Sequence, residues 1–242
     1  MRILAFDIET FPNEVWTWGL WNQNIAVNQI QNPGTVACWA AQWFDTGEVF
    51  YDSINRNDPV SMHRNLHELL CKADVVVSYN GKKFDIPWVQ TGFVTYGMRP
   101  PTFAHIDLLH VVRRQFKFPS YKLEYVVKAL GVGEKTPNAG FDLWKRCMAG
   151  DQDAWKLMEE YNINDTLLLD KLYNRVLPFI TNHPNRSLVE GLVCPNCGSS
   201  HYTKDGIRRN KGGMYQKYAC SDCGTPFRGN TNLAPKEKFL PL

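Results

Sequence analysis

This sequence of 242 residues has no apolar run that approaches the roughly 18 residues of a membrane-spanning helix. Its first apolar stretch is interrupted by Asp7 and Glu9, which argues against a signal peptide. It contains no internal repeat and no low-complexity segment. Hydrophobic residues make up 44% of the chain and aromatic residues 13%, so a disordered protein is excluded. We therefore expect a globular, cytoplasmic protein that has no membrane partner.

A strong net charge is also lacking, because the formal charge is only +3. The charge is unevenly distributed. From Cys194 to Leu242, eight Lys/Arg stand against three Asp/Glu, a net charge of +5, which leaves −2 for the preceding 193 residues. A near-neutral body with a basic C-terminal part favours an anionic partner, most simply nucleic acid.

Apolar and turn patterns predict an α/β fold. Strands are expected at 2–8, 14–20, 35–44 and 49–52, joined by turns into an antiparallel meander. A helix beginning at Asp58-Pro59, a strand at 74–79, a helix at 85–96 and a strand at 103–108 follow. Further helices are expected at 122–130, 141–148 and 151–179, with Asp151 as the cap of the last. This order predicts a mixed sheet with helices on its faces.

Asp7 and Glu9 are the first candidate site residues. In a strand they point to the same face, because side chains alternate with period two. Two carboxylates on one face at the end of a buried strand repel each other and are costly to desolvate. A bound cation is the usual remedy, and the alternative is a pair of solvated acids at a strand end.

Two later stretches carry matching polar residues. SYNGKKFDIPW leaves a buried strand and places Asp85 at a helix start, where the helix dipole alone could account for the acid and Asn80 could serve only the turn. YNIND places Tyr161 and Asp165 on one face of the last helix, although a surface Tyr–Asp pair would show the same spacing. Asp107, in HIDLL, fits a helix cap better than a metal ligand.

Taken in order, FDIET, SYNGKKFD and YNIND resemble the three exonuclease motifs of the DEDD 3′–5′ exonucleases, the DnaQ-like group of the ribonuclease H-like fold. The tyrosine four residues before the last aspartate resembles the DEDDy branch. The middle stretch is most similar to the proofreading domain of B-family DNA polymerases. The resemblance covers about residues 1–179 and implies a ribonuclease H-like mixed sheet.

The resemblance also implies roles for individual residues. Asp7, Glu9 and Asp165 would ligate one divalent cation, Asp7 would bridge to a second, and Asp85 would hold that second site. Tyr161 would orient the attacking water or help to deprotonate it, and Asn80 and Phe84 would contact or wall the terminal nucleotide. Carboxylate-only sites select Mg²⁺ or Mn²⁺, and two such ions can activate water and stabilise a leaving oxygen.

We therefore expect a metal-dependent 3′–5′ exonuclease that hydrolyses DNA, as single strands or at 3′ ends, to nucleoside monophosphates. Because the chain has no room for a polymerase, a stand-alone enzyme is expected. An RNA exonuclease of the same mechanism, a non-catalytic nucleic-acid-binding adaptor and an endonuclease acting on branched DNA are the alternatives. The sequence leaves the oligomeric state open.

Four of the seven cysteines form two C-x-x-C pairs, Cys194/Cys197 and Cys220/Cys223, with 22 residues between the pairs. Four thiolates at two tight turns suit a tetrahedral structural Zn²⁺. The alternative, redox-active pairs, would need a βαβ context that is missing. Cys38, Cys71 and Cys147 are isolated among apolar residues, as expected in a reducing compartment.

The segment between the cysteine pairs is basic. Arg208, Arg209, Lys211 and Lys217 alternate with tyrosines, so they are candidates for nucleic-acid contact, and a solvated hairpin is the alternative. We expect an exonuclease domain at 1–183, a linker at 184–193, a four-cysteine zinc ribbon at 194–229 and a tail at 230–242.

Overall fold

The computed structural model describes residues 1–137 and 140–237 of the chain. Two compact units make up the protein, Met1–Leu172 and Tyr173–Leu242. The last five residues of the predicted tail, 238–242, lie outside the described residues. Among the helices of the described ranges, none is both long and apolar enough to cross a membrane.

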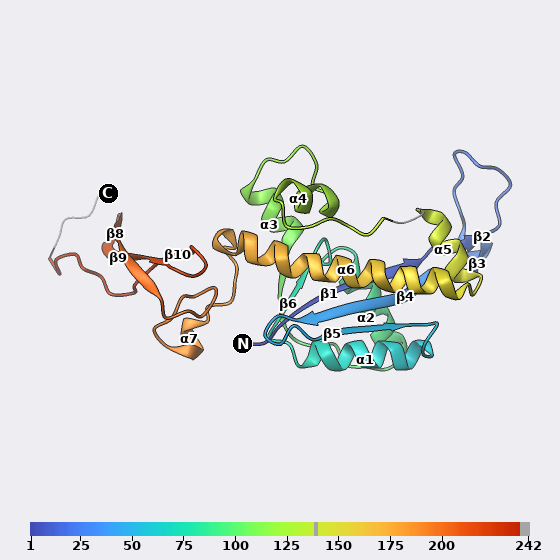
Figure 1. The fold of residues 1–242 in the computed structure, drawn as a ribbon, viewed down its shortest axis with the longest axis horizontal. Helices are drawn as coiled ribbons and strands as arrows, with labels where there is room; N and C mark the ends of the chain where they lie inside the picture. Colours follow the sequence, from blue (N-terminus) through green and yellow to red (C-terminus); the bar gives the residue numbers. More distant parts are fainter. Residues whose placement is uncertain (138–139, 238–242) are drawn as a thin grey trace. The chain divides into compact units, whose positions relative to one another are not determined.

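A five-stranded mixed sheet forms the centre of the first unit (Figure 1). Its strand order is β5 (Val49–Ser53), β4 (Thr35–Trp43), β1 (Ile3–Phe11), β6 (Val75–Ser78) and β7 (Ala104–Asp107). β1 pairs antiparallel with β4, which pairs antiparallel with β5, whereas β6 and β7 continue the sheet in parallel. The predicted α/β class and the mixed sheet are therefore confirmed.

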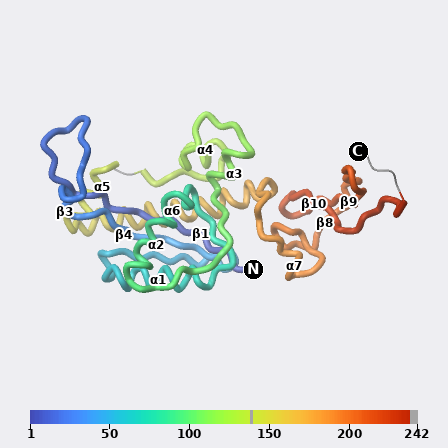
Figure 2. The backbone as a smooth tube through the Cα atoms, turned by 180° about the vertical axis from the view of Figure 1, so that it is seen from behind, coloured from blue at the N-terminus to red at the C-terminus, as the bar shows by residue number. Residues whose placement is uncertain are grey.

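β1 is buried on both faces, and its alternating side chains serve different layers. Leu4, Phe6 and Ile8 pack into the core beneath α1 (Pro59–Cys71) and α2 (Asp85–Thr95). The opposite face meets α6 (Gln152–Val176), whose Asn162 donates a hydrogen bond to Asp7. α6 lies in front of β1 and β4 in Figure 1, and the view from behind in Figure 2 shows α2 on the other side. Asp7 therefore faces α6.

A second apolar cluster fixes the far end of β1. Phe11 packs there with Ala37 and Cys38 of β4 and with side chains of α5 (Phe141–Met148) and α6. The Phe11 ring meets the Trp155 ring edge-on, with 5.7 Å between centroids. Two short helices, α3 (Leu108–Gln115) and α4 (Leu123–Ala129), follow β7 and complete the unit.

The strand predicted at 14–20 is wrong beyond Val15. Only Glu14–Val15 is extended, as β2, and it pairs with β3 (Ile30–Asn32) in a separate two-stranded sheet. Both edges of β1 are already taken by β4 and β6, so a further strand has no backbone partner there. The intervening residues form a loop with a 3₁₀ turn, η1 (Val27–Gln29).

The helix starts follow the predicted capping residues. Asp58 accepts hydrogen bonds from the backbone N–H groups of Val60 and Ser61 at the start of α1, and Asp151 accepts from Asp153 and Ala154 at the start of α6. α6 ends earlier than predicted, at Val176, and continues as the 3₁₀ turn η2 (Leu177–Phe179). Pro178 lacks the backbone N–H that a continuing helix would need.

The second unit contains a three-stranded antiparallel sheet in the order β10 (Pro226–Arg228), β9 (Gly213–Cys220) and β8 (Tyr202–Asn210). A four-residue helix, α7 (Ser187–Glu190), lies in the segment that the sequence predicts as a linker. Tyr202, Tyr218 and Phe227 pack together, with ring centroids 5.3–5.5 Å apart. These rings form the small apolar layer of the ribbon.

Candidate active site

Three carboxylates from distant parts of the chain meet at one point. Asp7 and Glu9 project from β1 and Asp165 from α6, and an oxygen of each lies within 4.8 Å of the others. We call these residues the acid cluster. The sheet and α6 bring them together because alternate residues of β1 face that helix. The sequence predicts all three as metal ligands, and the structure places them within reach of a single ion.

Burial and mutual repulsion raise the pKa values of the acid cluster. Burial raises the pKa of Asp7 well above its usual range, with the charges of Asp85, Glu9 and Asp165 adding to the effect. Burial, together with the Asp165 charge, raises the pKa of Glu9 to about 8. Burial also raises the pKa of Asp165, although Lys135 opposes this. The single ion pair with Lys135 does not compensate three acids that are buried or half-buried.

The donor set fits a hard divalent cation. Oδ1 of Asp165 is buried and has no hydrogen-bond partner within the described ranges of the chain. A buried carboxylate oxygen without a donor is costly, and three convergent carboxylates suit Mg²⁺ or Mn²⁺. The residues present therefore fit the metal that the sequence predicts at this point.

Asp85 is the first residue of α2 and lies close to the acid cluster. It is 2% exposed, and its Oδ1 accepts a hydrogen bond of 3.2 Å from the backbone N–H of Ile8, which lies between Asp7 and Glu9. Burial raises the pKa of Asp85 to about 7, and hydrogen bonds from the backbone N–H groups of Asp85 and Ile8 oppose the shift. Asp85 thus ties the α2 N-terminus to the strand that carries the cluster.

Lys135 is a site residue that the sequence analysis missed. Its Nζ lies 2.5 Å from Asp165 Oδ2 and donates a 3.0 Å hydrogen bond to the Tyr161 hydroxyl. Burial lowers the pKa of Lys135, but the Asp165 charge and its hydrogen bond outweigh this and hold it above its usual value. Nothing in the segment GVGEKTPNAG distinguishes this lysine from its neighbours, because its contacts are made only in the folded chain.

Tyr161 lies one helical turn before Asp165 and faces the same pocket. Burial and the Asp165 charge raise the pKa of Tyr161 to about 12, so its hydroxyl stays protonated at neutral pH. The Trp144 ring of α5 meets the Tyr161 ring edge-on, with centroids 6.2 Å apart. The hydroxyl is therefore held as a fixed hydrogen-bonding group beside the acid cluster.

A cavity of about 780 Å³ opens beside these residues. Its lining includes Asn80, Tyr121, Tyr161 and, as basic side chains, Arg113, Lys122, Lys128 and Lys135. Among the described residues of the lining, only Glu124 and Glu134 are acidic. A cavity of this size with a cationic excess suits a ligand that combines rings with phosphate.

Asp107 organises the turn that carries the second motif. Its Oδ1 accepts hydrogen bonds from the backbone N–H groups of Asn80 and Leu109, and its Oδ2 accepts from that of Lys82. It therefore caps α3, which is the alternative that the sequence analysis favours over a metal ligand. Asn80 itself has a φ of 67°, a left-handed conformation that asparagine tolerates better than most residues.

Phe84 lies just before Asp85 and is 40% exposed. Its ring meets the ring of Trp88, one turn further along α2, with 6.4 Å between centroids and an interplanar angle of 64°. A ring that is open to solvent next to a buried carboxylate is available to a ligand.

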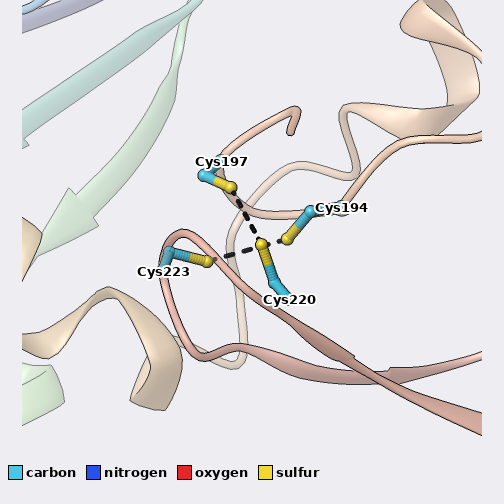
Figure 3. Close-up of side chains that lie close together, drawn as sticks. All are labelled: Cys194, Cys197, Cys220 and Cys223. Atoms are coloured by element: carbon cyan, nitrogen blue, oxygen red, sulfur yellow. Dashed lines mark hydrogen bonds between the residues drawn. The ribbon is translucent and has the colours of Figure 1, made fainter. Parts of the chain in front are cut away.

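The four predicted cysteines also come together. The sulfur atoms of Cys194, Cys197, Cys220 and Cys223 all lie within 4.8 Å of one another (Figure 3). Cys194 and Cys223 are 3.7 Å apart and Cys197 and Cys220 3.5 Å apart, and all four are free thiols. Gly198 and Gly224, one after each pair, have φ values of 79° and 76°, which the tight turns require. The cluster fits the zinc ribbon that the sequence predicts.

The basic residues of the second unit differ in their availability. Arg208 and Arg209 are exposed on β8, and Lys211 is exposed in the turn that follows. Lys217 of β9 is half-buried, and its Nζ lies 3.2 Å from Asp205 Oδ2. These four basic residues belong to the second unit, whereas the acid cluster belongs to the first.

Comparison with known families identifies a match over most of the chain. The family model described as "RNase_H superfamily" matches residues 4–177. That range includes Asp7, Glu9, Asp85 and Asp165 and ends before the first cysteine of the cluster.

Similar individual proteins are DNA polymerases. A DNA polymerase of Thermococcus litoralis is 24% identical over 207 residues, which is 74% of this chain and 12% of that protein. One of Pyrococcus glycovorans is 26% identical over 159 residues, which is 54% of this chain and 19% of that protein. This chain therefore corresponds to less than a fifth of the length of these relatives.

A solved structure shares the fold. The family B DNA polymerase of the hyperthermophilic archaeon Pyrobaculum calidifontis aligns with a TM-score of 0.57 and 18% sequence identity. The alignment covers 90% of this chain and 32% of the polymerase.

Proposed function

This chain belongs to the RNase H superfamily, and from that premise we propose that it is a metal-dependent 3′–5′ exonuclease that hydrolyses DNA to nucleoside monophosphates. The observation that carries the proposal is the convergence of Asp7, Glu9 and Asp165 in one cluster, in which Asp165 is buried and Asp7 and Glu9 are half-buried. Such a cluster is destabilising by itself, because burial and repulsion raise the pKa values of its acids. A polynucleotide phosphodiester with its bound cations is the chemistry that fits it.

Asp7, Glu9 and Asp165 would hold one Mg²⁺ or Mn²⁺, and Asp85 with Asp7 would hold a second. When bound, the two ions lower the pKa of the attacking water and stabilise the leaving oxygen. Asp85 is suited to the second position because its backbone link to Ile8 fixes it against β1. Oδ1 of Asp165 accepts no hydrogen bond from the described residues, so it is available to an ion at the first position.

Tyr161 and Lys135 complete the site around the acids. The protonated Tyr161 hydroxyl can orient a water molecule for attack, because a pKa of about 12 keeps it a donor as well as an acceptor. Lys135 remains charged and contacts both Asp165 and Tyr161, and its charge opposes the rise in the pKa of Asp165 that burial causes. Its ammonium group also lies where it can offset the negative charge of a phosphodiester.

The cavity beside the acid cluster would receive the end of the nucleic acid. Arg113, Lys122 and Lys128 would contact phosphates, and Asn80 and Phe84 would contact the terminal nucleotide. The turn that presents Asn80 is fixed by Asp107, so this contact would be preorganised. DNA is favoured over RNA because the similar proteins are named DNA polymerases. RNA cleavage by the same site is the second candidate activity.

In the second unit, we propose that Cys194, Cys197, Cys220 and Cys223 hold a structural Zn²⁺. The exposed Arg208, Arg209 and Lys211 would then contact substrate phosphates, with Lys217 contributing less because Asp205 already pairs with it. The thiols are free, as zinc ligation in a reducing cytoplasm would require.

An oligonucleotide assay tests the activity and its polarity. A DNA strand labelled at its 5′ end should give a ladder that shortens with time, and a strand labelled at its 3′ end should release labelled mononucleotide at once. EDTA should stop both reactions, and excess Mg²⁺ or Mn²⁺ should restore them. A matched RNA strand distinguishes the substrates, and a circular single strand must stay uncut. Cleavage of the circle, or activity that survives EDTA, would contradict the proposal.

A further inference from the structure

The loop between β2 and β3 is apolar, aromatic and uncharged. From Val15 to Gly34 it contains no Lys, Arg, Asp or Glu. Trp16, Trp18 and Trp21 are 70%, 100% and 83% exposed. We call residues 16–29 the tryptophan loop. Three indoles on one exposed segment are unusual, because large aromatic side chains are normally buried unless they bind something.

Polar contacts, and not the indoles, hold the tryptophan loop in place. Gln29 accepts a hydrogen bond from the Ala26 N–H and donates one to the Trp16 carbonyl, and the Trp16 N–H donates to the Gln29 carbonyl. Gln23 donates to the Trp21 carbonyl. The backbone is thus ordered while the rings remain available, which lowers the entropic cost of binding a ligand on them.

The strands at the base of the loop lie near two aromatic residues beside the candidate active site. Phe84, next to Asp85, contacts Trp88. Trp88 in turn packs against Gly34, which lies between β3 and β4, since a Cβ on Gly34 would lie 3.1 Å from the Trp88 ring. On the other side of the loop, Phe11 ends β1 only two residues after Glu9, a distance of about 7 Å along a strand. The loop projects from the sheet at this end in Figures 1 and 2.

We propose that the tryptophan loop is a stacking surface for the unpaired bases of a single-stranded nucleic acid whose 3′ end lies in the acid cluster. This inference rests on the proposed function. Bases offer uncharged aromatic faces, which match a loop that has rings and no charge, whereas phosphates would call for the cations found in the cavity. A membrane-binding loop would be expected to pair its aromatic residues with Lys or Arg, which are absent from this segment.

Affinity as a function of strand length tests the inference. We would measure Kd for a dinucleotide and for a twelve-nucleotide single strand in buffer without Mg²⁺ or Mn²⁺, where no hydrolysis occurs and no chelator strips the second unit of its zinc, using both oligo-dT and oligo-U. In the wild type the longer strand should bind more tightly. In W18S/W21S this gain from length should shrink about tenfold or more, because each stacked base contributes about 1–3 kcal/mol. Val94→Ser, which replaces a 75% exposed apolar residue on α2, is the matched control and should leave the gain unchanged.

Three outcomes would overturn the inference. The first is a gain from length that is equal in wild type and W18S/W21S. The second is binding to phosphatidylcholine vesicles that the double substitution abolishes while the oligonucleotide Kd values stay the same. The third is a change of oligomeric state, with unchanged Kd values, in the variant. If the protein hydrolyses no nucleic acid but the gain from length still depends on the tryptophans, the proposed activity fails and the stacking surface stands.

Discussion

The acid cluster and the cysteine cluster are assembled in opposite ways. Asp7 of the acid cluster accepts a hydrogen bond from Asn162, 155 positions away, whereas Cys194 and Cys223 of the cysteine cluster are 29 apart. The acids are carried by a sheet and a helix whose apolar cores on both faces are extensive. From residue 194 to 229, a range that the structure describes throughout, the fully buried apolar side chains are only Cys194 and Cys220. The fold thus brings repelling charges together in the first site, whereas the second unit has few buried apolar side chains besides its cysteines.

The largest expected effect comes from removing zinc from the second unit. Chelation, or Cys220→Ser, should unfold that unit, because a ribbon this small obtains most of its folding free energy from about 10–16 kcal/mol of metal binding. All eight tryptophans lie in the first unit, so tryptophan emission reports on that unit alone. Trypsin should cut rapidly between Lys204 and Arg228 while the denaturation midpoint by tryptophan emission stays constant.

Cys71→Ser is the matched control, since Cys71 is an exposed cysteine of α1. It should leave the tryptic pattern unchanged. A second unit that remains protease-resistant after its zinc has been removed would show that the metal is not what holds it together.

The next effect separates function from stability in the acid cluster. Asp7→Ala and Asp165→Ala should each lower the rate of hydrolysis about a thousandfold or more, because each removes a cation ligand. The thermal midpoint without metal should stay the same or rise in Asp7→Ala, since this change removes a repelling charge. It should fall in Asp165→Ala, since Lys135 then loses the partner of its ion pair. Initial rates and Tm would be measured together.

Asp153→Ala, on the exposed first turn of α6, is the control for an aspartate lost from the same helix. A purified Asp7→Ala or Asp165→Ala protein with activity within tenfold of the wild type would remove the acid cluster from the mechanism.

A smaller effect is expected from the neighbours of the acids. Tyr161→Phe should lower kcat about tenfold, less than either aspartate change, because it removes one hydrogen bond to the attacking water. Lys135→Met should lower kcat more than Tyr161→Phe, since Lys135 contacts both Tyr161 and Asp165. Lys156→Met, an exposed lysine on α6, is the matched control. If Lys135→Met and Lys156→Met have equal rates, the Lys135 contacts play no part in turnover.

The smallest effect is the pH dependence of stability without divalent cations. Burial raises the pKa of Glu9 to about 8 and that of Asp85 to about 7, from ordinary values near 4. The folded state therefore binds more protons than the unfolded state between about pH 4 and 8, so Tm in EDTA should fall by a few °C as the pH rises through that window. Mg²⁺ should restore Tm most strongly at pH 8. The fall should be smaller in Asp85→Asn, and an equal fall in both proteins would show that Asp85 does not contribute.

Local sequence predicts the parts of this fold that local physics decides. The capping aspartates, the buried strands and the cysteine pairs are each recognisable within a short stretch, and the structure places them as expected. The strand predicted at 14–20 fails for a non-local reason, because an extended segment needs a free sheet edge and both edges of β1 are occupied. Nothing within those seven residues contains that information.

The sequence by itself determined the residue types of both candidate sites. Carboxylates and thiols favour different metal ions, whatever the fold that presents them. Only the tertiary structure decided that Lys135 pairs with Asp165, that Asp107 serves the turn of Asn80, and that three tryptophans stay exposed. The physical reason is distance along the chain. Side chains that are far apart in the sequence meet only after the sheet and helices have packed together, and burial then sets how strongly they interact.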